Sequence, residues 1–175
     1  SSIDGQTFTI STPKNKYHLG IPLLGRHQLE NAAVAIGIIE SLIDYGMEIE
    51  LSSIEKGFRQ VEWPCRLEIL DKSPLILSDG AHNPHSAARL VEAVKELCPD
   101  SRILLIVGVS GNKDLEGLAG ELSLLPTTGI IATQSRHPRA TKPETVAHAF
   151  SMYNDNVSVV DSVSKALDIS RDMSA

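Results

Sequence analysis

The chain of 175 residues lacks the long apolar and strongly basic segments that mark membrane proteins and nucleic-acid binders. No apolar stretch approaches the roughly 20 residues that span a bilayer, which excludes a membrane protein. The formal net charge of −6 and the absence of a long basic run argue against a general nucleic-acid binder, because such proteins neutralise phosphates with lysine and arginine. Any anionic ligand must therefore be held by a local cluster of basic residues.

Cysteine is scarce as well. The only two, Cys65 and Cys98, follow neither the spacing of a disulfide framework nor that of a metal-binding knuckle. They fit a reducing compartment, so a cytoplasmic location is expected. The chain begins with two serines, without an initiator methionine or a signal segment, and is expected to be a piece of a longer protein.

Hydrophobic periodicity predicts two regions of different character. The first holds a strand pair at 7–11 and 17–23, a helix at 28–45, and a short helix for which Ser52 and Glu55 have the spacing of a capping box. In the second, strands and helices alternate. The expected strands lie at 67–70, 75–78, 102–109, 129–133 and 157–160, and the expected helices at 85–97, 114–124, 143–152 and 163–173. Runs such as 103–107 are apolar on both faces, which is typical of a parallel sheet covered by helices and predicts a doubly wound α/β fold.

Residues 79–84 read Asp-Gly-Ala-His-Asn-Pro and lie between an expected strand and an expected helix. An acid at the carboxyl end of a strand, followed by a glycine and a helix start, is how α/β sheets present polar groups to a ligand. Asp79 and His82 are therefore candidate functional residues. The alternative for Asp79 is a turn acid that bonds the local backbone. No metal site is expected at His82 and His85, because Pro84 interrupts helical spacing and no third ligand lies nearby.

The loops after the parallel strands should emerge at one sheet edge, which would bring Asp79, Asn112 and Arg139 together. Arg139 belongs to the densest basic cluster of the chain, which also contains Arg136, His137 and Lys142. This cluster is predicted to hold an anion, phosphate or carboxylate, although a solvated loop is the alternative. Residues 108–114 are glycine-rich but lack dinucleotide-binding spacing, so a turn with Asp114 capping the next helix is expected.

Four stretches occur in a specific order: residues 24–32 (LGRHQLENA), 63–68 (WPCRLE), 79–84, and Val107-Gly108 leading to Lys113-Asp114. Together they resemble folylpolyglutamate synthase/dihydrofolate synthase, the folate branch of the Mur ligase superfamily, over about residues 17 to 150. The resemblance implies that residues 1–61 are the tail of a central ATPase domain. Residues 62–175 would form the Rossmann-like C-terminal ligase domain, a doubly wound, mostly parallel sheet with helices on both faces.

The resemblance also implies roles for individual residues. Adenine would be reached by Asn31, with His27 and Gln28 shaping the same region, and Arg66 would contact ATP phosphate. Asp79 would hold the ribose hydroxyls or order the nucleotide from the second domain. His82 would act at the reacting centre and bind the incoming glutamate, and Asp79 and His82 are the expected catalytic residues. Asn83 is a further candidate for substrate binding, and so is Arg139, which is predicted from the basic cluster rather than from the resemblance. The family usually has glycine where this chain has Cys65, which predicts a different backbone turn before Arg66.

An ATP-dependent ligase is thus implied, one that activates a folate carboxylate as an acyl phosphate and joins it to L-glutamate. ATP and Mg²⁺ would be bound mainly by an upstream ATPase domain, because no Gly-x-x-x-x-Gly-Lys-Ser/Thr phosphate loop occurs in these 175 residues. The chain alone is therefore expected to be inactive, and the whole protein to be a monomer. Two alternatives stay open: another Mur-type amide ligase, and a non-catalytic nucleotide-binding or regulatory α/β module.

Overall fold

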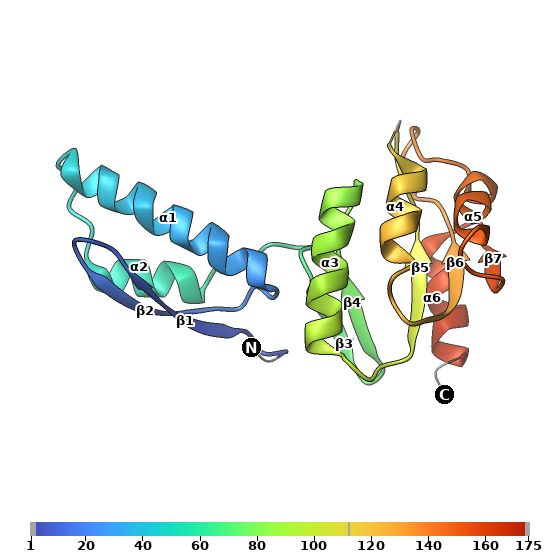
Figure 1. Ribbon diagram of the computed structural model, residues 1–175, viewed down its shortest axis with the longest axis horizontal. Helices are drawn as coiled ribbons and strands as arrows, with labels where there is room; N and C mark the ends of the chain where they lie inside the picture. Colours follow the sequence, from blue (N-terminus) through green and yellow to red (C-terminus); the bar gives the residue numbers. More distant parts are fainter. Residues whose placement is uncertain (1–2, 112, 174–175) are drawn as a thin grey trace. The chain divides into compact units, whose positions relative to one another are not determined.

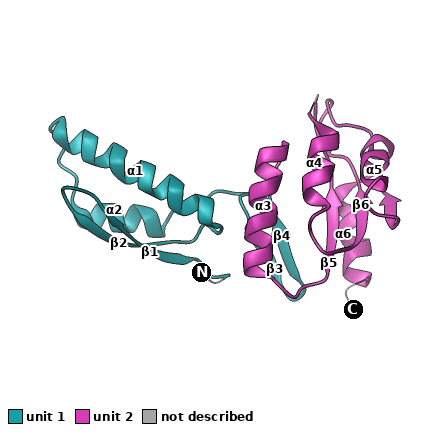
Figure 2. Cartoon of the chain, in the orientation of Figure 1, with its two compact units in different colours: residues 1–80 teal, residues 81–175 magenta. Residues whose placement is uncertain are grey.

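The computed structural model describes residues 3–111 and 113–173, and the chain divides into two compact units, Ser1–Gly80 and Ala81–Ala175 (Figures 1 and 2). The expected domain boundary between residues 61 and 62 falls inside the first unit and stays a prediction. Across the described residues, none of the helices has the length and apolar character that a membrane span requires.

The first unit is built on an antiparallel strand pair covered by two helices. Strand β1 (Gln6–Ser11) pairs along its length with β2 (Lys16–Ile21), and helices α1 (Arg26–Asp44) and α2 (Leu51–Arg59) follow. Alternation along the strands and helical periodicity along α1 and α2 direct apolar side chains into one core. Its buried members are Tyr17, Leu19, Ile36 and Ile54, with Phe8 and Phe58 packed against them.

The start of α2 differs from the sequence prediction. The N-cap is Glu50, no side chain caps the helix, and the helix begins at Leu51. Ser52 therefore lies inside the first turn, where its hydroxyl donates to the Glu50 carboxylate (3.1 Å) rather than to a backbone group. The predicted capping box of Ser52 and Glu55 is wrong, because the helix starts before the residue that was to cap it.

A second hairpin closes the first unit. Strand β3 (Glu68–Lys72) and strand β4 (Leu75–Ser78) pair antiparallel and form a sheet of two strands. Only Ser73 and Pro74 connect them, and a connection this short permits a hairpin but no parallel crossover. The predicted strands are confirmed here, but their direction departs from the mostly parallel sheet that was expected.

The second unit carries the parallel sheet that the apolar runs predict. Its strands β5 (Ile103–Val107), β6 (Thr127–Ala132) and β7 (Val157–Val159) are neighbours in that order and all parallel. Helices α4 (Leu115–Leu122) and α5 (Pro143–Ser151) form the two crossovers and pack against each other. Right-handed crossovers in one direction place both helices on the same face.

The remaining helices complete the layers of this unit. Helix α3 (Pro84–Leu97) packs against α4, whereas α6 (Val163–Asp172) follows β7 and returns to contact β5. The core between these layers is apolar, with Phe150, Val146, Leu118, Ile130 and Ile131 all almost fully buried. The mixed α/β fold class is therefore confirmed, with parallel strands in the second unit only.

Candidate functional site

Three of the predicted nucleotide-binding residues are joined by hydrogen bonds at the N-terminus of α1. The Gln28 side chain is buried, its Oε1 accepts from Asn31 Nδ2 (3.0 Å), and its Nε2 lies 3.0 Å from His27 Nε2. Because residues three apart share a helix face, the exposed Asn31 lies over the turn that contains Gln28. The structure thus joins His27, Gln28 and Asn31 by hydrogen bonds, and their contact with a nucleotide stays a prediction.

The turn before α1 is stabilised by a residue that the sequence reasoning missed. Gln6 is 5% exposed, and its Nε2 donates to the carbonyl oxygens of Leu23 (2.8 Å) and Gly25 (3.0 Å). The sequence contained one signal for this role, because Gln6 lies on the same inward face of β1 as Phe8 and Ile10. Burial of a side-chain amide costs free energy unless the amide finds hydrogen-bond partners.

A second group of candidates lies where the segment before β3 meets the end of β4. The Leu67 backbone N–H donates to Asp79 Oδ2 (2.8 Å), and the Gly80 N–H donates to the Cys65 carbonyl (2.7 Å). Two hydrogen bonds therefore hold Cys65–Leu67 against Asp79–Gly80. Arg66 lies between the bonded residues and is exposed, with its guanidinium carbon 5.2 Å from the centre of the Trp63 ring.

The backbone around Arg66 is unusual. Cys65 and Leu67 both have positive φ, 56° and 50°. These values lie in the left-handed region, which residues other than glycine rarely adopt. At Cys65 this is a conformation that glycine would adopt without strain. The expectation that Cys65 changes the turn before Arg66 stays a prediction. The Cys65 N–H donates to Glu68 Oε2 (2.8 Å), and the Leu67 side chain is 2% exposed. These contacts offset the strain and fix where Arg66 leaves the backbone.

The carboxylate of Asp79 reaches across to the backbone of Leu67, a partner twelve residues away in the sequence. The turn-acid alternative predicted that the Asp79 side chain bonds the backbone next to Gly80. The observed hydrogen bond is also to a backbone N–H, but that of Leu67. A carboxylate accepting an N–H is a structural role, and it is compatible with a second role for the same group because a carboxylate has about four acceptor positions.

His82 and Asn83 lie at the start of α3. The Asn83 side-chain oxygen accepts from the Ser86 N–H (2.8 Å), and Ser86 Oγ accepts from the N–H groups of Asn83 (3.2 Å) and His82 (3.1 Å). This reciprocal capping box was not predicted, because Ser86 takes the place usually filled by glutamate or glutamine. The His82 side chain is exposed, and so is His85 in the first turn of the helix.

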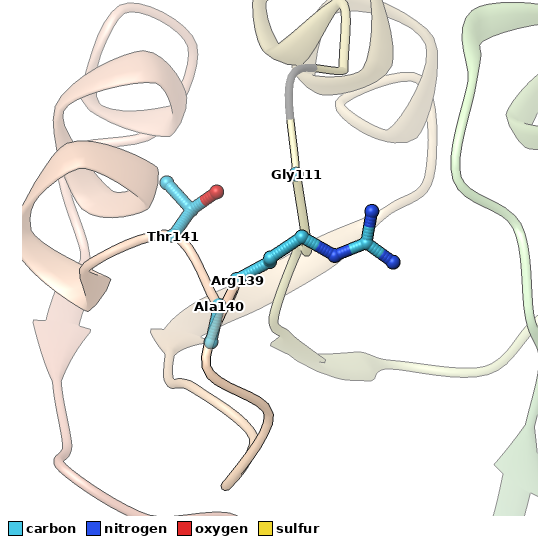
Figure 3. A pocket seen from close by; sticks show the side chains of 4 residues that line it. All are labelled: Gly111, Arg139, Ala140 and Thr141. Carbon is cyan, nitrogen blue, oxygen red and sulfur yellow. The ribbon is translucent and has the colours of Figure 1, made fainter.

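The basic cluster lies on a loop that pairs with the loop after β5. Gly111 N–H donates to the Arg139 carbonyl (2.7 Å), Thr141 N–H donates to the Val109 carbonyl (2.8 Å), and Ser110 forms an isolated antiparallel bridge with Ala140. A shallow depression is lined by Gly111, Arg139, Ala140 and Thr141 (Figure 3). In this view the Arg139 side chain extends past Gly111, with its guanidinium directed away from the Thr141 hydroxyl.

Two further predictions concern these loops. Asp114 caps α4, its side chain accepting from the Gly117 N–H (2.9 Å), so the predicted structural turn is confirmed. The expected neighbourhood of Asp79, Asn112 and Arg139 stays a prediction: Asn112 lies outside the described residues, and the other two belong to different units.

Thr133 is a second residue that the sequence reasoning missed. It follows β6 directly, its N–H donates to the Val107 carbonyl (2.8 Å), and it is 1% exposed. Its hydroxyl has no hydrogen-bond partner among residues 3–111 and 113–173. Nothing in the local sequence distinguishes it from an ordinary strand-end threonine.

No group of three or more His, Cys, Asp or Glu side chains in the part of the chain that the structure describes is arranged to hold a metal ion. Binding of Mg²⁺ by an upstream domain stays a prediction.

Comparison with known proteins connects this geometry to one family. Residues 65–175 match the family described as Mur ligase, glutamate ligase domain. Among curated relatives, the folylpolyglutamate synthase of Lacticaseibacillus casei is 33% identical over 141 residues, which are 78% of this chain and 32% of the relative. A probable bifunctional folylpolyglutamate synthase/dihydropteroate synthase of Haloferax volcanii is 28% identical over 93% of this chain and 19% of the relative.

A solved structure is similar over almost the whole chain. Mycobacterium tuberculosis folylpolyglutamate synthase complexed with ADP has a TM-score of 0.89 and 26% identity, covering 98% of this chain and 38% of that one. The chain thus spans between about a fifth and two-fifths of the length of these proteins.

Proposed function

The chain belongs to the Mur ligase family, and on that premise we propose that it is the C-terminal portion of an ATP-dependent ligase that adds L-glutamate to folates. The observation that carries this proposal is the pair of hydrogen bonds between Cys65–Leu67 and Asp79–Gly80. They join residues that lie twelve and fifteen positions apart in the sequence into one structural element, in which Arg66 and Asp79 belong to the two bonded segments. Similarity to folylpolyglutamate synthases along most of the chain supports it further.

The reaction divides into two balanced steps. A folate carboxylate attacks the terminal phosphorus of ATP, which forms an acyl phosphate and releases ADP. The amino group of glutamate then attacks the acyl carbon, an amide bond forms, and phosphate leaves. ATP supplies the activation, and Mg²⁺ in the upstream domain would neutralise the phosphate charge.

The side chains of this chain would bind and orient the reactants. Asn31 offers one amide with donor and acceptor to the adenine edge, while Gln28 and His27 fix its orientation. Arg66 is exposed and permanently charged, and its planar group suits phosphate oxygens. Asp79 would accept from the ribose hydroxyls.

The glutamate would be held in the second unit. The exposed His82 would lie at the reacting centre, and the Arg139 guanidinium would pair with a carboxylate of glutamate. Asn83 would contribute through its amide nitrogen, because its side-chain oxygen already accepts from Ser86. The upstream ATPase domain, the boundary near residues 61 and 62, a monomeric state and a cytoplasmic location belong to the same proposal.

The direct test is ATP hydrolysis coupled to glutamate incorporation by the full-length parent, with dihydropteroate and reduced folates offered separately. Arg66→Ala should raise the KM for ATP about tenfold, since a charge-assisted bond to phosphate contributes about 1.5 kcal/mol or more. Arg59→Ala, in the last turn of α2, is a matched control that should leave the KM unchanged. If ADP is released with a muramyl precursor as the acceptor but with none of the folates, the other Mur-type ligases are favoured. No ADP release with any acceptor would favour the non-catalytic module.

A further inference from the structure

The amide nitrogen of Gln6 holds a turn to which the residue does not belong. Its two N–H groups donate to the carbonyls of Leu23 and Gly25, seventeen and nineteen residues further along the chain. The residue begins β1, directly opposite Ile21 at the end of β2, so its side chain spans the opening of the strand pair toward the start of α1. A long, flexible side chain fixed in this way loses much rotamer freedom, which the two bonds to buried acceptors must offset.

The turn that Gln6 holds has no capping side chain at the N-cap of α1. Gly25 is the N-cap of α1, has φ 90°, and offers no side chain to cap the helix. Its carbonyl accepts both from Gln6 Nε2 (3.0 Å) and from the Gln28 backbone N–H (3.0 Å), the first bond of the helix. The position of the first turn of α1 is thus linked to strand β1 through one oxygen atom.

The same first turn carries the proposed adenine contact. From Gly25 the chain of hydrogen bonds continues through Gln28 to Asn31 (3.0 Å) and His27 (3.0 Å). We propose that Gln6 is a positioning residue for nucleotide binding: it fixes the Gly25 turn and thereby the place of Asn31 at the adenine. This inference rests on the proposed function, since it needs Asn31 to contact the nucleotide.

The chemistry of the position requires an amide. Methionine has nearly the same length and fits an apolar surrounding, but it has no N–H to give the two carbonyls. Asparagine keeps the amide but is one methylene too short to reach both oxygens. In either variant the Gly25 carbonyl keeps its helical partner and loses its external one, so α1 can still form while its first turn is free to shift.

The test uses the full-length enzyme with Gln6→Met and Gln6→Asn, and measures the KM for ATP, the KM for glutamate, kcat and thermal unfolding. A misplaced adenine contact weakens ATP binding without changing the chemistry. Both variants should therefore raise the KM for ATP about five- to tenfold, with the KM for glutamate and kcat at saturating ATP within about twofold. If Gln6→Met fails to fold, Gln6→Asn carries the test alone.

Leu19→Ala is the matched control, because it removes a buried core side chain of the same strand pair and leaves both hydrogen bonds of Gln6 to the Gly25 turn in place. It should lower the melting temperature and the active fraction, hence kcat, but leave the KM for ATP unchanged. An equal rise of that KM in the control would show a merely structural effect and overturn the inference. So would an unchanged KM in both Gln6 variants when Asn31→Ala raises it. An unchanged KM in Asn31→Ala would instead refute the proposed nucleotide contact itself.

Discussion

Asp79 has a structural bond and a proposed ligand role, and two substitutions separate them. Its Oδ2 accepts from the backbone N–H of Leu67, a residue that is 2% exposed and has a φ of 50°. Asp79→Ala removes the oxygen to which that N–H donates, whereas Asp79→Asn keeps a side-chain oxygen at the same place and removes the charge. Stability and activity should therefore respond differently to the two changes.

The magnitudes follow from the kind of bond. A hydrogen bond to a charged group contributes about 1.5–3 kcal/mol, so Asp79→Ala should lower the unfolding free energy by ~2 kcal/mol and the melting temperature by roughly 4–8 °C. Asp79→Asn retains a neutral bond of about half that strength and should lower the melting temperature by roughly 2–4 °C. Both variants should lose ligase turnover in the full-length enzyme, since neither keeps the carboxylate for the ribose hydroxyls.

Circular dichroism melting of the variants, with an ADP-release assay of the full-length forms, checks both parts. Asp71→Ala is the control: its carboxylate also accepts backbone N–H groups, those of Lys72 and Ser73, but at the exposed turn of the same hairpin. It should cost less stability and leave turnover unchanged. An Asp79→Ala variant as stable as the wild type would refute the structural role, and a fully active Asp79→Asn would refute the need for the charge.

Two other predictions concern buried hydroxyl groups. Thr133→Val removes a hydroxyl that is buried without a partner in the described structure and keeps the side-chain shape. It should raise the unfolding free energy by about 1 kcal/mol and the melting temperature by roughly 2–4 °C, and a lower melting temperature would contradict this. Burial, with the nearby Glu40 carboxylate, raises the pKa of Tyr17 above its ordinary value of 10.0. As the pH rises, the Tyr17 hydroxyl therefore loses its proton in the unfolded state before it does so in the folded state. The stability that this hydroxyl contributes is fully present below about pH 10 and is lost as the pH rises through the higher folded-state pKa. Tyr17→Phe should show a smaller fall in melting temperature between pH 9 and pH 11 than the wild type, and equal falls would contradict the assignment.

The sequence predicted the secondary structure well wherever apolar periodicity is strong. The helices α1, α3 and α6 and the strands of the parallel sheet lie within a few residues of the expected ranges, because their apolar faces are buried as the period requires. The direction of β3 relative to β4 was not foreseen. The connection of two residues between these strands forces them to run antiparallel. This constraint is stronger than the surrounding alternation of strands and helices, which predicted a parallel sheet.

Polar contacts to the backbone were the least predictable features. The capping box at Ser52 was expected and is absent, while one at Asn83 and Ser86 was not expected and is present. The partners of Gln6 and Asp79 lie far away in the sequence, and their identity depends on how distant turns are folded. A residue type alone indicates that a partner exists, but only the tertiary structure determines which one.

The proposed ligand residues and their supports differ in burial, and this difference predicts how substitutions will act. Asn31 and Arg66 are exposed, so their replacement should change binding and leave the fold nearly intact. Gln6 and Asp79 form hydrogen bonds with the backbone next to these exposed residues. Gln6 bonds to the turn before α1, which carries Asn31, and Asp79 bonds to the segment before β3, which carries Arg66. Replacing either support should therefore change ligand affinity and stability together. In both elements an exposed side chain would contact the ligand, and a less exposed residue would hold the backbone of that side chain in place. Preorganised binding requires this arrangement.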